Sequence, residues 1–413
     1  MERREVLKLV SVATLMGGVL GPKNIAIAAA QTAEKAVPRN LFQELGIRTF
    51  INARGTITAM TGSLMQQEVL DAIQSGAQEF CMLDEVQDKV GEKIAAIVHS
   101  EAAVVTSGAF SALTLGLAGV LTGLDEKKVK QLPHLAGTGM KTEVICQKSH
   151  DIVYNQALTN TGCKMIMVET EAELENAIND RTALLFFLNI EADKGQINHE
   201  KWVAIGKKHG IPTMIDIAAD VPPVSNLWRF NDMGFDLVCI SGGKAMRGPQ
   251  SAGILMGKKA IIQAARLSMP PRGFNIGRGM KVNKEEVLGM YVALEKFVNQ
   301  DHDAVWKDWE SRTAQVARTV ESVEGITTRV FVPQLGNVTP NLEISWKPEQ
   351  ISLDGESLAN KLRNGNPSIE LGEVKANNVS LTVWMMKPGE EQIVADRLKE
   401  ELLKASGKAE KTA

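Results

Sequence analysis

Two neighbouring stretches decide the fold: residues 213–224 (TMIDIAADVPPV) and residues 236–256 (DLVCISGGKAMRGPQSAGILM). Each contains a short apolar run that is typical of a buried strand. Asp216 lies where the first run ends, and Lys244 lies in the glycine-rich turn that follows the second. Because sites in open α/β sheets lie where strands end, we expect this acid and this amine at one edge of a sheet.

An acid and an amine in these positions suit an enzyme that carries an aldehyde cofactor on its lysine. The carboxylate would keep the ring nitrogen of the cofactor protonated, so that the ring draws electrons from the substrate. Residues 248–250 then read as a turn and residues 252–256 as a further buried strand. Two simpler interpretations are a surface position for Lys244 and a structural capping role for Asp216. The apolar strands on both sides of the loop favour the site.

The run SGGKAMRGPQSAGIL resembles the lysine segment of fold-type-I pyridoxal-phosphate enzymes. More narrowly, it is similar to the group of bacterial selenocysteine synthase (L-seryl-tRNA(Sec) selenium transferase) and D-glucosaminate-6-phosphate ammonia-lyase. Further similar segments are INARGT at 51–56, TSGA at 106–109 and RGMKV at 278–282. Together the similarity covers most of the chain, from about residue 41 to about residue 403.

Repeated alternation of strand and helix patterns predicts an α/β fold with a mainly parallel sheet that is covered on both faces. The resemblance implies a seven-stranded sheet in a large domain and a small α+β C-terminal domain. The expected organisation is a signal peptide at 1–30, an N-terminal arm at 31–48, a cofactor-binding large domain at 49–283, a connecting helix at 284–310, a small domain at 311–403 and a mobile tail at 404–413.

The N-terminus has the pattern of an export signal. Arg3 and Arg4 precede a moderately apolar stretch at 9–20, and three alanines follow at 28–30. This pattern resembles a twin-arginine signal, and its apolar part is too short to span a bilayer. We therefore expect a periplasmic or exported protein, which would be cytoplasmic if the signal is not used. No membrane span is expected once the signal is removed.

The resemblance also implies where the cofactor is bound. Its phosphate is expected on the turn Ser107-Gly108-Ala109, where a strand gives way to a helix, with help from Ser241. The free amides and the dipole of a helix N-terminus favour such an anion. His150 follows a predicted strand at 144–147, and the resemblance suggests that its ring stacks over the cofactor. Tyr154 is the alternative for that role.

The residues that hold the substrate are less determined by the sequence. Asn52 and Arg54 belong to a segment that, by resemblance, crosses near the active site. Arg54, Arg272, Arg278 and Arg363 could each hold a substrate carboxylate through a two-pronged hydrogen bond. The sequence does not choose between these arginines, and surface positions fit equally well.

Lys244 is expected to carry the cofactor aldehyde, and its freed amine would act as the general base at the substrate Cα. The resemblance then implies β-elimination with loss of ammonia from an amino acid or an amino sugar acid.

Alternatives on the same core are β-replacement as in the selenium transferase, and racemase, aldolase or aminotransferase reactions. Gly243 stands where selenocysteine synthase has an acidic residue, which weakens the transferase interpretation. A non-catalytic binding protein is the remaining alternative, and the presence of both Lys244 and Asp216 argues against it.

Composition narrows the range of partners. The 413-residue chain is 44% hydrophobic and 23% charged, as in a soluble globular protein, and its formal net charge is −3. No dense run of Lys and Arg is present, so nucleic acid is not an expected partner. The four cysteines show no metal-binding spacing, so no metal site is expected. By resemblance the chain is expected to form a homodimer or a larger homo-oligomer, with the loop 268–278 contributing to the neighbouring site.

Overall fold

The computed structural model describes residues 39–407. The predicted signal peptide, most of the predicted arm and the end of the predicted tail lie outside the described residues. The chain divides into two compact units, at 1–49 and 50–413. In the first, the short helix α3 (Leu41–Glu44) begins after Asn40, whose side chain accepts a hydrogen bond from the Gln43 amide at 3.2 Å. In this described part α3 is exposed throughout.

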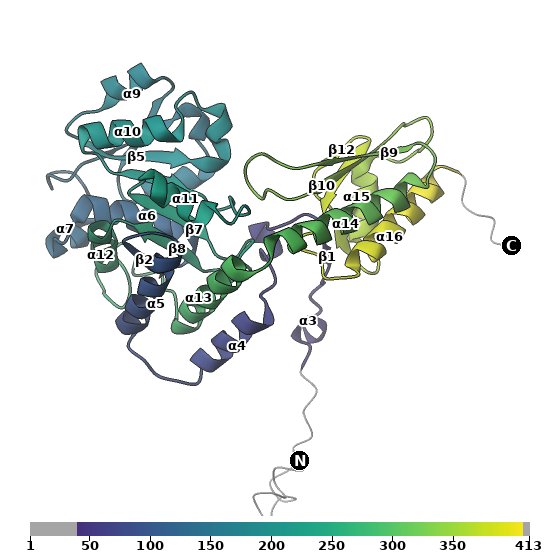
Figure 1. The fold of residues 1–413 in the computed structure, drawn as a ribbon, viewed down its shortest axis with the longest axis horizontal. Coiled ribbons are helices and arrows are strands. Elements are labelled where there is room, and N and C mark those ends of the chain that lie inside the picture. The colour runs from purple at the N-terminus through teal and green to yellow at the C-terminus, as the bar shows by residue number, and fades with distance from the viewer. Residues whose placement is uncertain (1–38, 408–413) are drawn as a thin grey trace, which may run out of the picture. The chain divides into compact units, whose positions relative to one another are not determined.

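The second unit is built on a sheet that has seven strands among residues 50–407, in the spatial order β2-β8-β7-β6-β5-β3-β4 (Figure 1). Strand β8 pairs antiparallel with both β2 and β7, and the other neighbours pair parallel. The predicted mainly parallel, seven-stranded sheet is confirmed. In chain order the strands are β2 (Ala102–Thr106), β3 (Glu143–Gln147), β4 (Lys164–Val168), β5 (Thr182–Leu188), β6 (Thr213–Asp216), β7 (Leu237–Ser241) and β8 (Gly253–Gly257).

Helices cover both faces of this sheet, because the central strands are apolar on both sides. One face packs against α4 (Gln67–Gly76), α5 (Leu83–Ile97), α9 (Glu171–Ala177), α10 (His199–His209), α11 (Asn226–Met233) and α13 (Lys284–Asn299). The other packs against α6 (Gly108–Thr122), α8 (Gln156–Thr159) and α12 (Lys259–Leu267), and α7 (Glu126–Gln131) contacts α6. Short 3-10 turns add η1 (Thr58–Met60), η2 (Lys148–His150), η3 (Val153–Asn155) and η4 (Asn189–Lys194).

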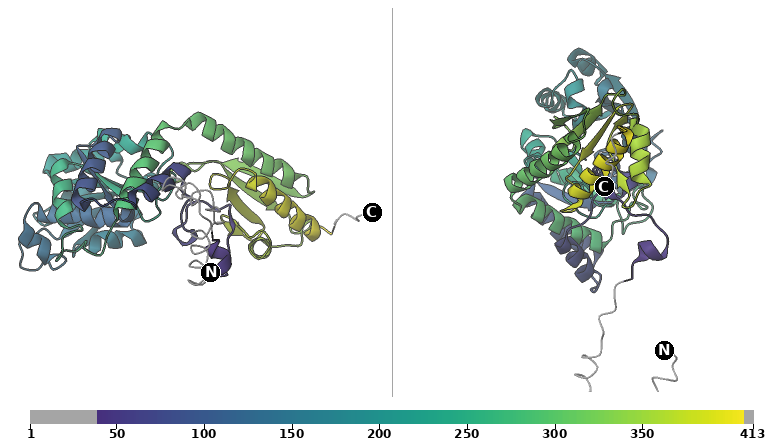
Figure 2. Two further views of the ribbon diagram at one scale, coloured as in Figure 1. Left: turned by 90° about the horizontal axis from the view of Figure 1, so that it is seen from below. Right: turned by 90° about the vertical axis from the view of Figure 1, so that its right-hand side faces the viewer.

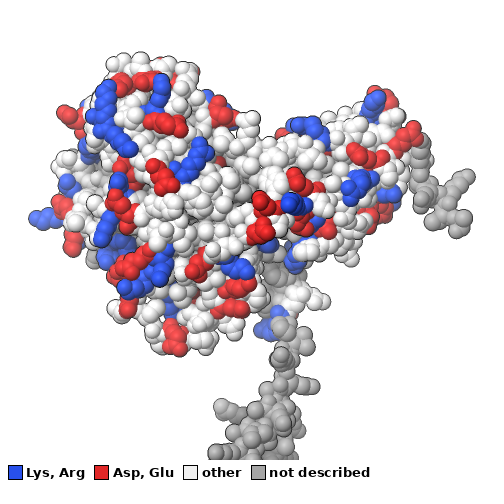
Figure 3. Space-filling view, in the orientation of Figure 1, with Lys and Arg blue, Asp and Glu red and all other residues white. Residues whose placement is uncertain are grey.

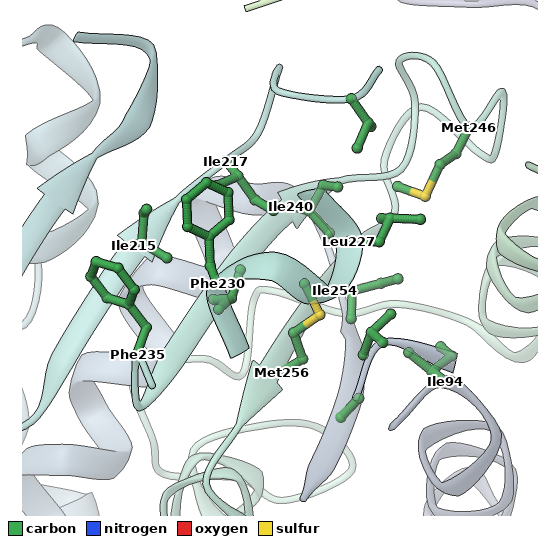
Figure 4. Close-up of a cluster of buried hydrophobic side chains, with 14 of the residues drawn as sticks. Ile94, Ile215, Ile217, Leu227, Phe230, Phe235, Ile240, Met246, Ile254 and Met256 are labelled. Atoms are coloured by element: carbon green, nitrogen blue, oxygen red, sulfur yellow. The ribbon is translucent and has the colours of Figure 1, made fainter. Parts of the chain in front are cut away.

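Alternate side chains along the central strands point to opposite faces of the sheet and so belong to two hydrophobic cores. Ile215 and Ile217 of the β6 region join Phe230 and Phe235 in the first core (Figure 4). Met214, from the same strand, lies in the second core. Strand β6 is therefore enclosed from both sides, and its last residue, Asp216, is carried to the sheet edge by a fully buried segment.

The small domain has an antiparallel sheet with the order β12-β13-β10-β9, and α14 and α16 lie side by side against it (Figure 2). Its elements are α14 (His302–Glu321), β9 (Ile326–Phe331), β10 (Asn341–Trp346), α15 (Gly355–Arg363), β11 (Ile369–Glu370), β12 (Val374–Lys375), β13 (Asn378–Thr382) and α16 (Glu390–Ala405). Strand β1 (Ile51–Asn52) pairs parallel with β11. Residues 51–53, expected in the large domain, therefore belong to the core of the small one, because Ile51 and Ala53 pack there.

Two helical patterns in the sequence are interrupted in the structure. The expected connecting helix at 284–310 is two helices, since α13 ends at Asn299 and α14 begins at His302. Asp301 starts the second helix by accepting a hydrogen bond from the Ala304 amide at 2.9 Å. The apolar residues of 66–100, which recur at helical spacing, likewise divide between two helices, α4 and α5. The final helix α16 continues to Ala405, into the expected tail.

The surface of the described residues carries both charge signs. On the face drawn in Figure 3, Lys and Arg are interspersed with Asp and Glu. No helix among residues 39–407 is long and apolar enough to cross a membrane.

Candidate active site

Lys244 lies in a loop whose two ends are fixed by neighbouring strands. Strand β7 ends at Ser241 and β8 begins at Gly253, and these two residues are paired across the sheet. The ladder continues for one more step into the loop, where the Gly242 amide donates to the Ala252 carbonyl at 2.8 Å. The lysine is therefore held by backbone hydrogen bonds on both sides.

The interior of this loop is tightly packed. Met246 is buried and points into the core beside Ile240 and Leu227 (Figure 4). A Cβ atom at Gly242 would lie 2.1 Å from Met290 Sδ. A Cβ atom at Gly243 would lie 2.5 Å from the Cα atom of Gln250, on the other side of the loop. These distances explain the glycine pair before Lys244, because only glycine fits the approach.

Asp216 lies at the end of β6, next to β7, and is 6% exposed. The Ala218 amide donates to Asp216 Oδ1 at 2.8 Å. Burial raises the pKa of Asp216, while burial lowers the pKa of Lys244 from that of an ordinary lysine. The carboxylates of Asp216 and Asp220 counteract the shift at Lys244. The structure thus brings the acid and the amine predicted from the sequence into one buried electrostatic cluster.

A cavity of about 230 Å³ opens beside the amine. It is lined by Lys244 together with Thr56, Thr58, Gly62, Ser241, Gly243, Gln250 and Ser251. The segment after β1 is held over the loop because Gln250 Nε2 donates to the Thr58 carbonyl at 3.0 Å. Polar side chains of this segment and of the lysine loop therefore face the same small space.

The start of α6 lies directly against β8, the strand that follows the lysine loop. A Cβ atom at Gly253 would lie 2.5 Å from the carbonyl carbon of Gly108, so the two backbones touch. Gly108 has φ +85°, which favours glycine. The Ser107 hydroxyl bonds to Ser111 Oγ at 2.9 Å and does not cap the helix. The amides of the first turn, Ala109 included, are left free to bind an anion.

These features fit pyridoxal phosphate. A half-buried amine suits the aldehyde, a buried carboxylate at the end of β6 suits the ring nitrogen, and a helix N-terminus without a side-chain cap suits the phosphate. No group of three or more His, Cys, Asp or Glu side chains that could hold a metal occurs among the described residues.

The prediction for His150 does not fit its surroundings. The ring is fully buried, the Leu188 amide donates to Nδ1 at 3.1 Å, and Nε2 faces the Gln147 side chain. Its edge packs against Phe187 at 4.5 Å between ring centroids. His150 does not line the cavity beside Lys244. It is a core histidine between β3 and β5, and burial lowers its pKa to about 4. The alternative, Tyr154, is exposed.

The predicted substrate residues are dispersed, and none of them lines the cavity beside Lys244. Asn52 closes a local turn, because its Oδ1 accepts from the amides of Arg54 and Gly55 at 3.0 Å each. Arg272 is paired with Asp84 at 3.1 Å. The remaining predicted arginines lie at the surface or in an ion pair: Arg54 and Arg278 are exposed, and Arg363 bonds to Glu370.

Sequence reasoning missed two groups of residues. Asp220 is buried and interacts electrostatically with both Asp216 and Lys244. It lies four positions after Asp216 in the stretch that decides the fold, so its proximity could have been considered. Thr56 and Thr58 reach the cavity from a distant part of the chain. Thr56 ends the similar segment INARGT but was not predicted as a site residue, and no local pattern marks Thr58.

Comparisons with known proteins agree with this geometry. The Aminotransferase class-V family model matches residues 74–277. D-glucosaminate-6-phosphate ammonia lyase of Salmonella typhimurium (strain 14028s / SGSC 2262) is 25% identical over 374 residues, which covers 87% of this chain and 97% of that protein. A solved structure titled as D-glucosaminate-6-phosphate ammonia-lyase has a TM-score of 0.79 at 25% identity, and covers 89% of this chain and 100% of that one.

Two further relatives carry different names. The 5'-C-glycyluridine monooxygenase-decarboxylase of a Streptomyces species is 26% identical and covers 89% of this chain and 93% of that protein. The L-seryl-tRNA(Sec) selenium transferase of Alkaliphilus oremlandii (strain OhILAs) is 23% identical, with 87% and 83% covered. The chain therefore carries an aminotransferase class-V domain and has the fold-type-I pyridoxal-phosphate transferase fold, and it is similar along most of its length to the ammonia lyase and the selenium transferase.

Proposed function

We propose that this protein is a pyridoxal-phosphate-dependent lyase that removes a β-substituent and ammonia from a hydroxylated amino acid or amino sugar acid. The observation that carries the proposal is the electrostatic interaction between the half-buried amine of Lys244, in the loop after β7, and the buried carboxylate of Asp216, at the end of the adjacent parallel strand β6. The similarity to the ammonia lyase along nearly its whole length supports the reaction type. Bound pyridoxal phosphate would supply an electron sink for the bond that breaks at Cα.

Each residue of the site has a separate task in this proposal. Lys244 would hold the cofactor and, when its amine is released, take the proton from the substrate Cα; its lowered pKa favours the neutral amine that this step needs. Asp216 would hold a proton on the cofactor's ring nitrogen through a charged hydrogen bond. The amides of Gly108 and Ala109, with the hydroxyls of Ser107 and Ser241, would hold the phosphate.

The loop and the segment over it would control access of water. Thr56 and Thr58 face the cavity and can donate hydrogen bonds to a hydroxyl or carboxylate of the substrate. Gln250 ties this segment to the lysine loop. The glycines before Lys244 are closely packed, and Lys244 itself lines the cavity.

One relative supports a second candidate function. The glycyluridine monooxygenase-decarboxylase matches this chain over as much of its length as the ammonia lyase does. Its name describes decarboxylation with oxygen incorporation, in place of elimination. Release of CO₂ with consumption of O₂ would identify that reaction, whereas release of ammonia with a 2-oxo acid would identify the proposed elimination.

The test of the proposed chemistry is the replacement Lys244→Ala. We expect turnover to fall by at least about 10³-fold, because the attachment point and the base are lost together. The purified wild-type protein should absorb in the visible range and lose that absorption with borohydride, and the variant should not react in this way. Lys201→Ala, an exposed lysine paired with Glu171, is the matched control. Wild-type activity in the Lys244 variant would overturn the assignment.

We also propose that the protein is an exported homo-oligomer. Support for assembly comes from large apolar side chains that are strongly exposed, namely Phe80, Met82, Val153, Tyr154 and Phe274. Support for export is the twin-arginine-like sequence at 1–30, which lies outside the described residues. Cell fractionation would test the location, and a cytoplasmic wild-type protein would contradict it.

A further inference from the structure

Asp220 is a buried carboxylate for which the proposed chemistry has no use. It is 2% exposed and lies one turn beyond Asp216 on the way out of β6. The Gly336 amide donates to Asp220 Oδ1 at 3.1 Å, and the Asn189 side chain also bonds to this carboxylate. Asn189 Oδ1 in turn bonds to His199 Nε2 at 2.8 Å. Segments distant in sequence therefore meet at one carboxylate.

The Gly336 amide belongs to the β9–β10 loop, residues 332–340, which comes from the small domain. The loop makes a second backbone contact beside the first, where the Asn337 amide donates to the Ala219 carbonyl at 2.6 Å. Asn337 Oδ1 also accepts from the Thr56 hydroxyl at 3.3 Å, and Thr56 lines the cavity. The loop is thus bonded both to the chain next to Asp216 and to the cavity wall.

The shape of the contact is specific. Gly336 has φ +65°, and a Cβ atom there would lie 2.6 Å from Ile190 Cδ1. The positive φ favours glycine at this turn, and the Ile190 side chain would have to move to admit a Cβ atom.

The groups around Asp220 act on its pKa in opposite directions. Burial and the neighbouring Asp216 raise it, the Asn189 and Gly336 donors and the Lys244 amine lower it, and the pKa of Asp220 is about 6 as a result. His199 lies behind Asn189 and its own pKa is lowered to about 4 by burial, so it is neutral near pH 7. Residues 332–340 contribute no titratable side chain.

Both hydrogen-bond partners of this carboxylate are donors, which favours its ionised form. Protonation of Asp220 would remove the negative charge toward which the Gly336 amide donates. The added proton would itself need a hydrogen-bond acceptor. The Gly336 amide therefore offsets part of the cost of burying this carboxylate when the loop is docked.

We propose that Asp220 is a positioning residue: its ionised carboxylate docks the β9–β10 loop of the small domain against the sheet edge that carries Asp216 and Lys244. The docked loop fixes Thr56 and with it one wall of the cavity. The docking does not depend on the proposed reaction, so it can be tested on the chain without cofactor or substrate.

The test is hydrogen exchange of the peptide 332–340, measured at pH 8. In Asp220→Asn we expect the protection of this peptide to be at least about tenfold lower than in the wild-type protein, because the charge and one hydrogen-bond acceptor are lost. Asp193→Asn, a replacement of an exposed acid of η4, should keep the wild-type protection. Wild-type protection in Asp220→Asn would overturn the proposal.

Gly336→Ala is the second variant, because it keeps Asp220 and changes only the fit of the loop. We expect it to lose protection in 332–340 at pH 8 while the strands of the large sheet stay protected. Unchanged protection in this variant would also overturn the proposal, even if Asp220→Asn does not fold.

A further readout separates positioning from cofactor chemistry. With cofactor added, Asp220→Asn should keep the wild-type absorption spectrum and raise KM about tenfold, with a much smaller change in kcat. Loss of the spectrum, as expected for Lys244→Ala, would place Asp220 in the cofactor machinery and contradict the positioning role. Failure of the lyase assay in the wild-type protein would affect the proposed reaction alone.

Discussion

His150 shows how a single buried side chain ties stability to pH. The unfolded chain binds a proton on this residue near pH 6.5, whereas burial holds the pKa in the folded chain at about 4. Stability is therefore fully present above pH 6.5 and falls as the pH decreases toward 4. Each pKa unit corresponds to about 1.4 kcal/mol, so His150 alone should lower the free energy of unfolding by about 3 kcal/mol across this range.

The replacement His150→Asn tests this dependence, since an amide oxygen can still accept from the Leu188 amide without titrating. Urea unfolding between pH 7.5 and 4.5 should show a smaller loss of stability in the variant than in the wild type. His134→Asn, an exposed histidine, should leave the wild-type slope unchanged. The same slope in all three proteins would contradict the assignment of the effect to His150.

Individual residues were predictable where their local sequence context carries the information. Asp216 and Lys244 stand at the ends of apolar runs, and that pattern is visible within a few positions. Asp220 and Gly336 lie 116 positions apart, and their contact depends on how the small domain meets β6. Arg272 could not be excluded as a substrate ligand from sequence alone, because its partner Asp84 lies on another element.

Helix α6 has a glycine with positive φ at each end, and only the first of the two lies at the proposed phosphate site. Gly108 at the start has φ +85° and Gly123 at the end has φ +52°, and a Cβ atom at Gly123 would meet nothing within 4 Å. Replacement of either by alanine should cost about 1–2 kcal/mol of stability through backbone strain. Only Gly108→Ala should also weaken the binding of pyridoxal phosphate, by about tenfold, because it alters the amides that hold the phosphate.

Titration of each variant by absorbance or protein fluorescence measures the affinity, and thermal unfolding without cofactor measures the stability. An equal loss of affinity in Gly108→Ala and Gly123→Ala would show that the effect comes from general destabilisation. Unchanged affinity in Gly108→Ala would remove the start of α6 from the proposed phosphate site.

The elements themselves were largely visible in the sequence, and their interruptions were not. Apolar periodicity continues across residues 284–309, so one helix was expected, yet Asp301 caps a second helix there. An aspartate is compatible with a helix interior as well as with a cap, and its backbone conformation decides between them. The pairing of β1 with β11, more than 300 residues away, has no local signature.

For the whole molecule, the exposed apolar side chains predict self-association. Light scattering coupled to size exclusion should give a mass of at least two chains. The double replacement Phe80→Ser and Phe274→Ser should shift the mass toward one chain, because it removes two of the largest exposed apolar groups. Ile393→Ser, at a partly exposed position on α16, is a control that should leave the mass unchanged. A single-chain mass for the wild type would contradict the prediction.

Because paired strands fix both ends of the lysine loop, the loop itself offers little scope for a change in substrate preference. Residues 242–252 are confined by two paired strands and by side chains with no spare room, so they tolerate little variation. The segments at 56–62 and 332–340 approach the same space from outside the sheet and are bound there by few hydrogen bonds. We therefore expect sequence changes that alter substrate preference to occur in these two segments, while the position of the Lys244 amine stays the same.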